Sequence, residues 1–417
     1  MTGHAAAGRT AARLPVGVVA VVCGGVSAAL HLGKLPPAVP ALQSTLGIGL
    51  IEAGFLLSLV QLAGMALGLA VGLVADQIGL RRSMLAGLTL LTLASVLGGL
   101  AGAMGGAHAV PWLLTSRAIE GLGFLLTVMP APGLIRRLAP AGADKAALGL
   151  WGAYMPFGVA LALLLGPASI GWAGWPGWWS ALSVVSALAA GWIVRVVPAD
   201  MAFEKPMPSQ GPRLRATVAA SGPWLVASAF AVYSAQWIAV IGFLPAIYAG
   251  AGVPSGWSAV LTAAAAAMNI VGNIAGGRWL QRGGAPATLL RWGFATMALA
   301  GIAAFAQVGQ GVQAEALPPA LRYIAVCVFS LGGGVVPATL FMLAVRVAPG
   351  PATVSTTVGL MQQASAFGQF LAPPAVAWIA HRVGGWQWTW LATLACSLVG
   401  IALAGSLARR HAATEVA

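Results

Sequence analysis

The sequence predicts an all-α, polytopic membrane protein, with twelve transmembrane helices arranged as two six-helix pseudo-repeats around a central cavity. Of the 417 residues, 59% are hydrophobic and 7% are charged, and the mean hydropathy is +0.90. Soluble globular domains do not have this composition. Apolar runs of about 20 residues, the length that spans a bilayer, recur along the whole chain. The two halves of the chain also match one another at a nearly constant offset.

Polar, Pro-rich or Gly-rich breaks separate the apolar runs and so predict the spans in order. The expected spans are 15–40, 50–74, 83–106, 110–134, 145–168, 176–197, 222–248, 256–279, 286–308, 319–345, 353–378 and 387–408. The basic tail before the first run resembles the start of a signal peptide, but the eleven further spans favour an uncleaved first helix. The three cysteines lie inside apolar spans, which is typical of small core residues rather than of a disulfide framework.

The longest polar break, residues 198–221, divides the spans into six and six. We therefore expect a cytoplasmic tail at 1–14, an N-terminal six-helix bundle at 15–197, a cytoplasmic linker at 198–221, a C-terminal six-helix bundle at 222–409 and a cytoplasmic tail at 410–417.

A shift of 205 residues relates the two halves. It superimposes Arg117 on Arg322 and Pro132 on Pro337, and it superimposes Gly72, Asp76 and Gly79 on Gly277, Gln281 and Gly284. Secondary transporters built from two related halves bind substrate near the bilayer midplane, where the halves meet. The repeat therefore predicts a central cavity at that interface.

The net charge of +13 is distributed according to topology. If the N-terminus is cytoplasmic, 17 of the 21 Lys and Arg residues fall on the cytoplasmic side, as the positive-inside rule requires. Two Trp-rich segments, 171–179 and 384–390, fall in the predicted outer loops, at the level where Trp is enriched. We expect a multi-pass protein of a bacterial inner membrane with both termini cytoplasmic, and no nucleic-acid partner.

The stretch GLVADQIGLRR, residues 72–82, concentrates charge in a short turn between the second and third spans. Its residues Gly72, Asp76, Gly79, Arg81 and Arg82 resemble the signature loop between helices two and three of the major facilitator superfamily. Other segments carry the resemblance further. Arg117, Gly121 and Gly123 resemble the family's helix-four signature, and Gly158, Gly166 and Pro167 meet part of its helix-five pattern. Residues 127–138 and 149–155 resemble the cyanate and nitroimidazole branch.

The resemblance implies that Asp76 faces the start of helix eleven and latches the two halves when the cavity opens outward. A carboxylate is favourable near a helix N-terminus, because the helix dipole is positive there. Arg81 and Arg82 would hold the turn on the cytoplasmic side. The alternative is a plain positive-inside turn in which Asp76 is an ordinary helix-end residue.

Two pairs of charged or titratable residues in the first and fourth spans are functional candidates, because burial of charge there is costly. His31 and Lys34 are three residues apart in the first span, and Arg117 and Glu120 are three apart in the fourth, where they can pair. The alternatives are a structural ion pair for Arg117 and Glu120, snorkelling for Lys34 and a satisfied core histidine for His31.

The C-terminal half supplies mostly neutral candidates for substrate binding. They are Tyr233, Gln236, Asn269, Asn273, Arg322 and Gln362. Interhelical hydrogen bonding is the alternative role of the neutral side chains. Snorkelling is the alternative for Arg322, which lies about one turn inside its span.

The chain has no Walker-type phosphate loop, no HExxH motif and no paired metal-ligand cluster. We therefore expect no enzyme activity, no catalytic residues, no metal and no cofactor. The prediction is a secondary active transporter that moves a small anionic solute by alternating access. Its basis is that Lys34 and Arg117 outnumber Glu120, and a buried cation gains when an anion completes its pairing. Glu120 is expected to cancel the charge of Arg117, which leaves Lys34 as the decisive residue.

Histidine has an ordinary pKa of about 6.5, so His31 is the candidate carrier of a co-transported proton. The expected partners are a small-molecule substrate, a proton and the lipid bilayer, and we expect a monomer. Two alternatives remain open. One is a proton-driven efflux antiporter for drugs or metabolites, and the other is a non-transporting membrane sensor built on a transporter fold.

Overall fold

The computed structural model describes residues 14–104, 106–140, 147, 150–151, 154–200, 211–308, 315–350 and 353–416. Most of the expected N-terminal tail and residues 201–210 of the expected linker lie outside this part of the chain. In the described ranges the fold is helical, with a single short antiparallel pair, β1 (Gln307–Val308) and β2 (Glu315–Ala316). This pair forms a small hairpin that the sequence did not predict.

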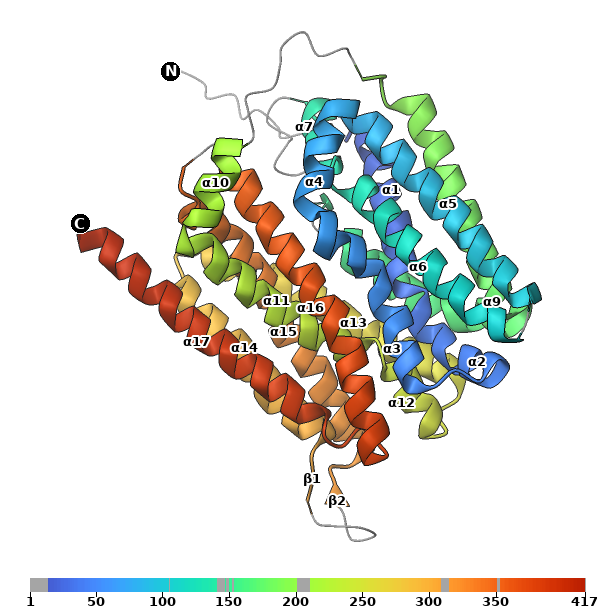
Figure 1. The fold of residues 1–417 in the computed structure, drawn as a ribbon. Helices are drawn as coiled ribbons and strands as arrows, with labels where there is room; N and C mark the ends of the chain where they lie inside the picture. The colour runs from blue at the N-terminus through green and yellow to red at the C-terminus, as the bar shows by residue number, and fades with distance from the viewer. Residues whose placement is uncertain are drawn as a thin grey trace, which may run out of the picture.

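Two groups of helices make up the molecule (Figure 1). The first group, the N-half, contains α1 (Val16–Gly33), α2 (Leu35–Leu46), α3 (Leu50–Ser58), the 3-10 turn η1 (Leu59–Gln61), α4 (Leu62–Ile78), α5 (Leu80–Met104), α6 (Gly106–Val128), α7 (Ala131–Leu138) and α9 (Tyr154–Val196). The second group, the C-half, contains α10 (Gly211–Ala219), α11 (Ser221–Ile241), α12 (Leu244–Gly250), α13 (Ser255–Gln281), α14 (Pro286–Phe305), α15 (Pro319–Val347), α16 (Val354–Val383) and α17 (Thr389–Val416).

Among the described residues, ten helices are long and apolar enough to cross a membrane. The predicted fifth and sixth spans appear as one element, α9, which turns sharply at Gly174. The turn needs glycine there because its φ of 67° lies in the left-handed region. The predicted eleventh span corresponds to α16, whose glutamines make it more polar than the ten. The molecule is therefore a multi-pass membrane protein.

The two ends of the molecule differ in the elements that lie there. At one end lie α7 and α10 with Arg136, Arg137, Arg213 and Arg215, and we call it the basic end (Figure 1). The hairpin β1–β2 lies at the opposite end, which we call the hairpin end (Figure 1). The positive-inside rule predicts that the basic end is cytoplasmic.

The halves meet along two seams, where α3 and α4 pack on α16 and where α9 packs on α13. Small residues bring the first seam close together, since a Cβ on Gly54 would lie 2.9 Å from the Cα of Pro374. Polar side chains cross the same seam. The amide of Gln363 donates to the backbone carbonyl of Met65 at 2.8 Å, and Gln61 donates to Gln369 at 3.1 Å.

Candidate functional site

The buried charges of the N-half come together through a break between α1 and α2. Lys34 is the junction between the two helices, and Pro36 and Pro37 follow it in the first turn of α2. Proline has no backbone N–H, so it starts a new helix more readily than it continues one. The break places the Lys34 side chain inside the bundle, where none of it is exposed.

Glu120 on α6 is the centre of the cluster. Its Oε1 accepts a hydrogen bond from the Lys34 ammonium, and its Oε2 lies 2.5 Å from Nη1 of Arg117. Nδ1 of His31 lies 3.7 Å from Oε1 of Glu120 and 3.4 Å from Nζ of Lys34. All four side chains are fully buried. We call His31, Lys34, Arg117 and Glu120 the charge cluster.

The pairing corrects one expectation. Arg117 and Glu120 do pair, but Lys34 contacts the same carboxylate, so it does not keep an unpaired charge. Nor does the cluster open onto a cavity in this conformation, because all four members are enclosed. One carboxylate nevertheless balances only one of two cations, since Arg remains charged in proteins. With His31 neutral and Lys34 charged, the charge cluster carries one excess positive charge.

Further polar atoms hold the Lys34 and His31 side chains in place. Nζ of Lys34 donates to Ser95 on α5 at 3.0 Å and lies 4.5 Å above the ring of Trp179 on α9. Nε2 of His31 is 2.8 Å from the hydroxyl of Ser186, also on α9. The cluster therefore lies within the N-half and is bounded by α1, α5, α6 and α9.

Arg117 is anchored by the backbone of two neighbouring helices. Its Nε donates to the carbonyl of Leu56 at 3.1 Å, and its Nη1 donates to the carbonyl of His31 at 2.8 Å. The remaining nitrogen, Nη2, is buried and has no hydrogen-bond partner among the described residues. An unsatisfied buried donor is costly, more so when it is charged. Arg117 thus has a donor available for a further acceptor.

The neutral candidates of the C-half make hydrogen bonds of their own, in two separate groups. The Asn269 amide donates to the Tyr233 hydroxyl at 3.0 Å and to the backbone carbonyl of Ser330 at 3.1 Å. Gln236 accepts a hydrogen bond from Ser397 at 3.0 Å. Two further candidates, on α13 and α16, are half-buried: Asn273 and Gln362. The structure does not bring these side chains to the charge cluster.

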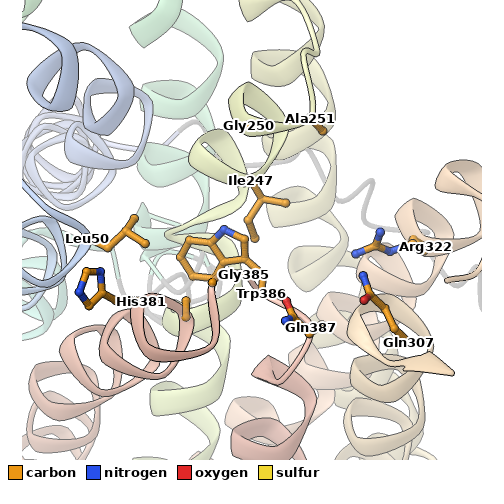
Figure 2. Close-up of a pocket in the computed structure, with 12 residues that line it drawn as sticks. Leu50, Ile247, Gly250, Ala251, Gln307, Arg322, His381, Gly385, Trp386 and Gln387 are labelled. Carbon is orange, nitrogen blue, oxygen red and sulfur yellow. The ribbon is translucent and has the colours of Figure 1, made fainter. Parts of the chain in front are cut away.

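Arg322 lies away from both groups. Its Nε donates to the carbonyl of Ala304 at 2.7 Å, and the side chain lines a pocket of about 550 Å³ at the hairpin end (Figure 2). The pocket contains no member of the charge cluster. The 205-residue shift that matches Arg117 with Arg322 therefore links a buried cluster residue to a pocket-lining one.

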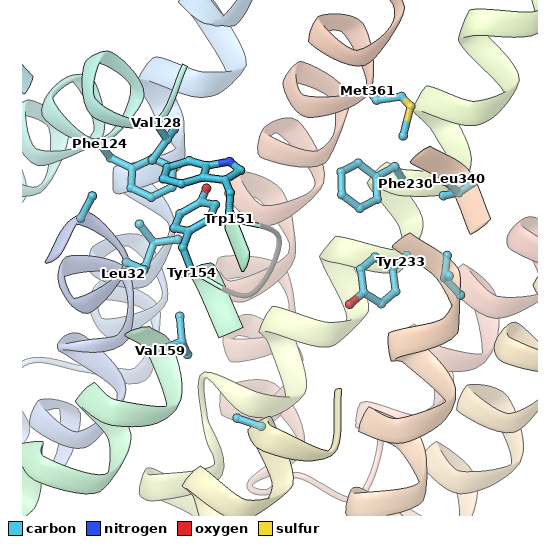
Figure 3. Close-up of a cluster of buried hydrophobic side chains, with 14 of the residues drawn as sticks. Leu32, Phe124, Val128, Trp151, Tyr154, Val159, Phe230, Tyr233, Leu340 and Met361 are labelled. Carbon is cyan, nitrogen blue, oxygen red and sulfur yellow. The ribbon is translucent and has the colours of Figure 1, made fainter. Parts of the chain in front are cut away.

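The sequence analysis named Tyr233 as a candidate but missed its partner Phe230 and a second aromatic pair, Trp151 and Tyr154. Trp151 and Tyr154 of the N-half stack with ring centroids 4.1 Å apart, and Phe230 and Tyr233 of the C-half stack at 5.9 Å. Both pairs belong to one buried cluster that spans the halves (Figure 3). Each pair has the i, i+3 spacing that places two side chains on one helix face. That spacing was the signal available in the sequence.

At the turn between α4 and α5, the structure assigns a role to a carboxylate that the sequence analysis did not single out. Asp200, just after α9, accepts hydrogen bonds from the backbone N–H groups of Arg81 at 3.1 Å and Arg82 at 2.9 Å. It thereby occupies the N-terminal end of α5, where a negative charge is favourable. The side chains at positions 72–77 lie outside the described residues, and Gly72 and Asp76 are among these positions.

Gly79 is the residue that makes this arrangement possible. Its φ is 101°, a left-handed conformation that residues with a Cβ rarely adopt. A Cβ at this position would also lie 2.3 Å from Oδ2 of Asp200. Arg81 supports the turn from its other side by donating from Nη2 to the carbonyl of Val194 at 2.8 Å.

Comparison with known proteins gives one family and several similar structures. A family model described as the Major Facilitator Superfamily matches residues 20–373. A bacterial homologue of the human lysosomal transporter Spinster, solved in an inward-facing and unoccupied conformation, is 16% identical with a TM-score of 0.74. A D-xylose–proton symporter is 15% identical with a TM-score of 0.71. Each alignment covers 94% of this chain and 96% of the other. A search of curated proteins gives no significant match.

Proposed function

Because the chain belongs to the major facilitator superfamily, we propose that it is a secondary active transporter that moves a small solute with an anionic group across a bacterial inner membrane by alternating access. The membrane location, the transporter fold and the family are the premises of this proposal. The proposal that the substrate is anionic rests on one observation: Lys34 and Arg117 share the carboxylate of Glu120.

The charge balance of the cluster favours an anion. A net charge inside a membrane-spanning bundle is costly, and a second negative group would remove the excess positive charge. Arg117 offers Nη2, which has no partner among the described residues. Lys34 would offer the donor that now binds Glu120, once that pair separates. Charge-assisted hydrogen bonds to carboxylate or phosphate oxygens are the strong ones. A cationic solute would instead add to the excess charge.

Alternating access supplies the opening that the enclosed cluster needs. The interface seams α3/α4 on α16 and α9 on α13 are formed by elements from different halves, so relative movement of the halves breaks and remakes them. Movement of α1 or α2 about the junction at Lys34 would separate its ammonium from Glu120. The anion would then replace Glu120 as the partner of Lys34.

Proton coupling is proposed to act through His31. In the described arrangement its Nδ1 is close to both the Lys34 ammonium and the Glu120 carboxylate, at 3.4 and 3.7 Å. A proton on His31 repels Lys34 and attracts Glu120. Protonation would therefore weaken the Lys34–Glu120 pair and release Lys34 for the substrate. That a structurally similar protein is described as a proton symporter is consistent with this proposal.

Flux measurements in proteoliposomes test the proposal. Small organic and inorganic anions and common cationic drugs would be screened, each with and without a pH gradient. An anion that is transported should lose at least about tenfold of its rate in Lys34→Met, because a charge-assisted hydrogen bond is lost, while Lys34→Arg keeps part of it. Both variants would be compared at equal membrane insertion and thermal stability.

The other results identify the alternatives. Robust transport of a cationic drug that is unaffected by Lys34→Met and by excess anion would reject the anionic substrate and favour an efflux antiporter. Specific binding of a ligand without any flux would reject transport and favour a membrane sensor. Anion flux that does not respond to the pH gradient or to His31→Gln would reject only the coupling role of His31.

A further inference from the structure

The pocket at the hairpin end has two chemically different walls. Its volume of about 550 Å³ lies within the range of small-molecule sites. Leu50, Ile247 and Trp386 supply apolar surface, and Figure 2 shows the Trp386 ring in the middle of the group and the His381 ring beside Leu50. Leu50 belongs to the N-half, whereas the remaining lining residues belong to the C-half.

The other wall carries a positive charge and two amides. Arg322, Gln307 and Gln387 line it, and Figure 2 shows the Arg322 guanidinium beside the Gln307 side chain. The bond from Nε to the carbonyl of Ala304 fixes the plane of the guanidinium and uses only one of its five donors. Among the side chains that the structure describes, no carboxylate forms an ion pair with Arg322.

We propose that this pocket is a second binding site, for a small monocarboxylate with a flat apolar body. A carboxylate fits the planar fork of Arg322 in a bidentate manner, and the amide groups of Gln307 and Gln387 supply further donors. The flat body packs on Trp386 and the aliphatic side chains of Leu50 and Ile247. This site goes beyond the proposed transport function, because it shares no residue with the charge cluster.

Binding at this pocket also favours one arrangement of the halves. The pocket exists where Leu50 of the N-half approaches residues of the C-half, in a region where α2 also contacts α12. A ligand stabilises the conformation to which it binds best. A monocarboxylate in the pocket therefore holds the hairpin ends of the two halves together.

Isothermal titration of the purified full-length protein with sodium benzoate tests the site, with benzamide as the neutral probe of the same shape. Benzoate should bind saturably at one site and raise the melting temperature, whereas benzamide should bind at least about tenfold more weakly. Arg322→Gln should weaken benzoate binding by a similar factor, and Arg322→Lys by less. Arg382→Gln is the matched control, because Arg382 packs over Trp378 and does not line the pocket.

Gln387→Glu gives an independent result if Arg322→Gln does not fold. It places a negative charge in the same wall and should also abolish benzoate binding. The proposal is overturned if benzoate does not bind, if benzamide binds equally well, or if neither pocket variant changes the affinity. Lys34→Met separates the two sites: it should leave benzoate binding unchanged. Binding that is lost in Lys34→Met but kept in Arg322→Gln would place benzoate in the charge cluster and reject the second site.

Discussion

Asp200 accepts a hydrogen bond from the backbone N–H of Arg82 at 2.9 Å, so the chain that leaves α9 is tied to the start of α5. The two residues are 118 positions apart in the sequence. The same carboxylate also accepts a hydrogen bond from the N–H of Arg81. Asp200 therefore satisfies two of the free donors at the beginning of α5. The turn of the family signature is therefore fastened within the N-half.

The first prediction is that Asp200→Ala destabilises the protein. Loss of a side chain that caps a helix N-terminus costs about 0.5–2 kcal/mol of folding free energy. Asp200→Asn should cost less, because its amide oxygen still accepts one bond. Thermal unfolding in detergent measures both. Arg82→Gln is the control and should leave the folding stability close to that of the parent, since the bond uses the backbone of Arg82 and its side chain is exposed. Equal stability of Asp200→Ala and the parent would show that the cap contributes nothing.

The second prediction is that Gly79→Ala destabilises the same turn. Its cost is about 1–2 kcal/mol for the left-handed backbone alone, and the contact with Asp200 adds to it. Gly277→Ala, at the position that the 205-residue shift relates to Gly72, is the control. Gly277 lies within α13 with open space around it, so alanine there should be neutral or stabilising. Similar unfolding temperatures for the two variants would contradict the assigned role of Gly79.

The third prediction concerns the charge cluster. Glu120→Gln leaves Lys34 and Arg117 buried without a carboxylate, which should cost about 3–5 kcal/mol. Adding Lys34→Met removes one of the two cations, so the double variant should be more stable than Glu120→Gln alone. Thermal unfolding of the single and double variants gives the coupling between them. Glu52→Gln, at an exposed position on α3, controls for the loss of a carboxylate. Strictly additive effects would mean that Lys34 and Glu120 do not interact.

The fourth prediction concerns Asp76, which is proposed to latch the two halves when the cavity opens outward. Asp76→Asn preserves the size of the side chain but removes the charge that favours a helix N-terminus, so transport should fall while membrane insertion stays normal. Asp76→Glu keeps the charge and should retain more activity. Solute uptake and the amount of inserted protein would be measured together. Parental uptake by Asp76→Asn would leave the turn with a topological role only.

The fifth prediction is the orientation in the membrane. In a background without the native Cys23, Cys327 and Cys396, a single cysteine at Gln387 should react with a membrane-impermeant reagent from the periplasmic side. A single cysteine at Arg213 should react only from the cytoplasmic side, because the positive-inside rule puts the basic end there. The reverse pattern of labelling would invert the orientation of both ends.

Much of the architecture could be predicted from the sequence alone. The membrane class follows from long apolar runs, because the bilayer requires about 20 such residues per helix whatever their partners are. The superfamily could be recognised from the turn at 72–82, and the family match confirms it. The i, i+3 spacing of Arg117 and Glu120 predicted that they can pair, since this relation is local to one helix.

Only the tertiary structure decided which distant groups meet. Lys34 and Glu120 lie on different helices, so no spacing in the sequence shows that Lys34 shares the carboxylate of Arg117. For the same reason, no spacing in the sequence shows that Asp200 binds the backbone N–H of Arg82. Nor does it show that Arg322 and Trp386 line the same pocket. The hydrophobic pattern determines that helices form and face a core. The packing of particular side chains between helices determines which polar groups satisfy one another, because a buried donor must find its acceptor wherever the fold places one.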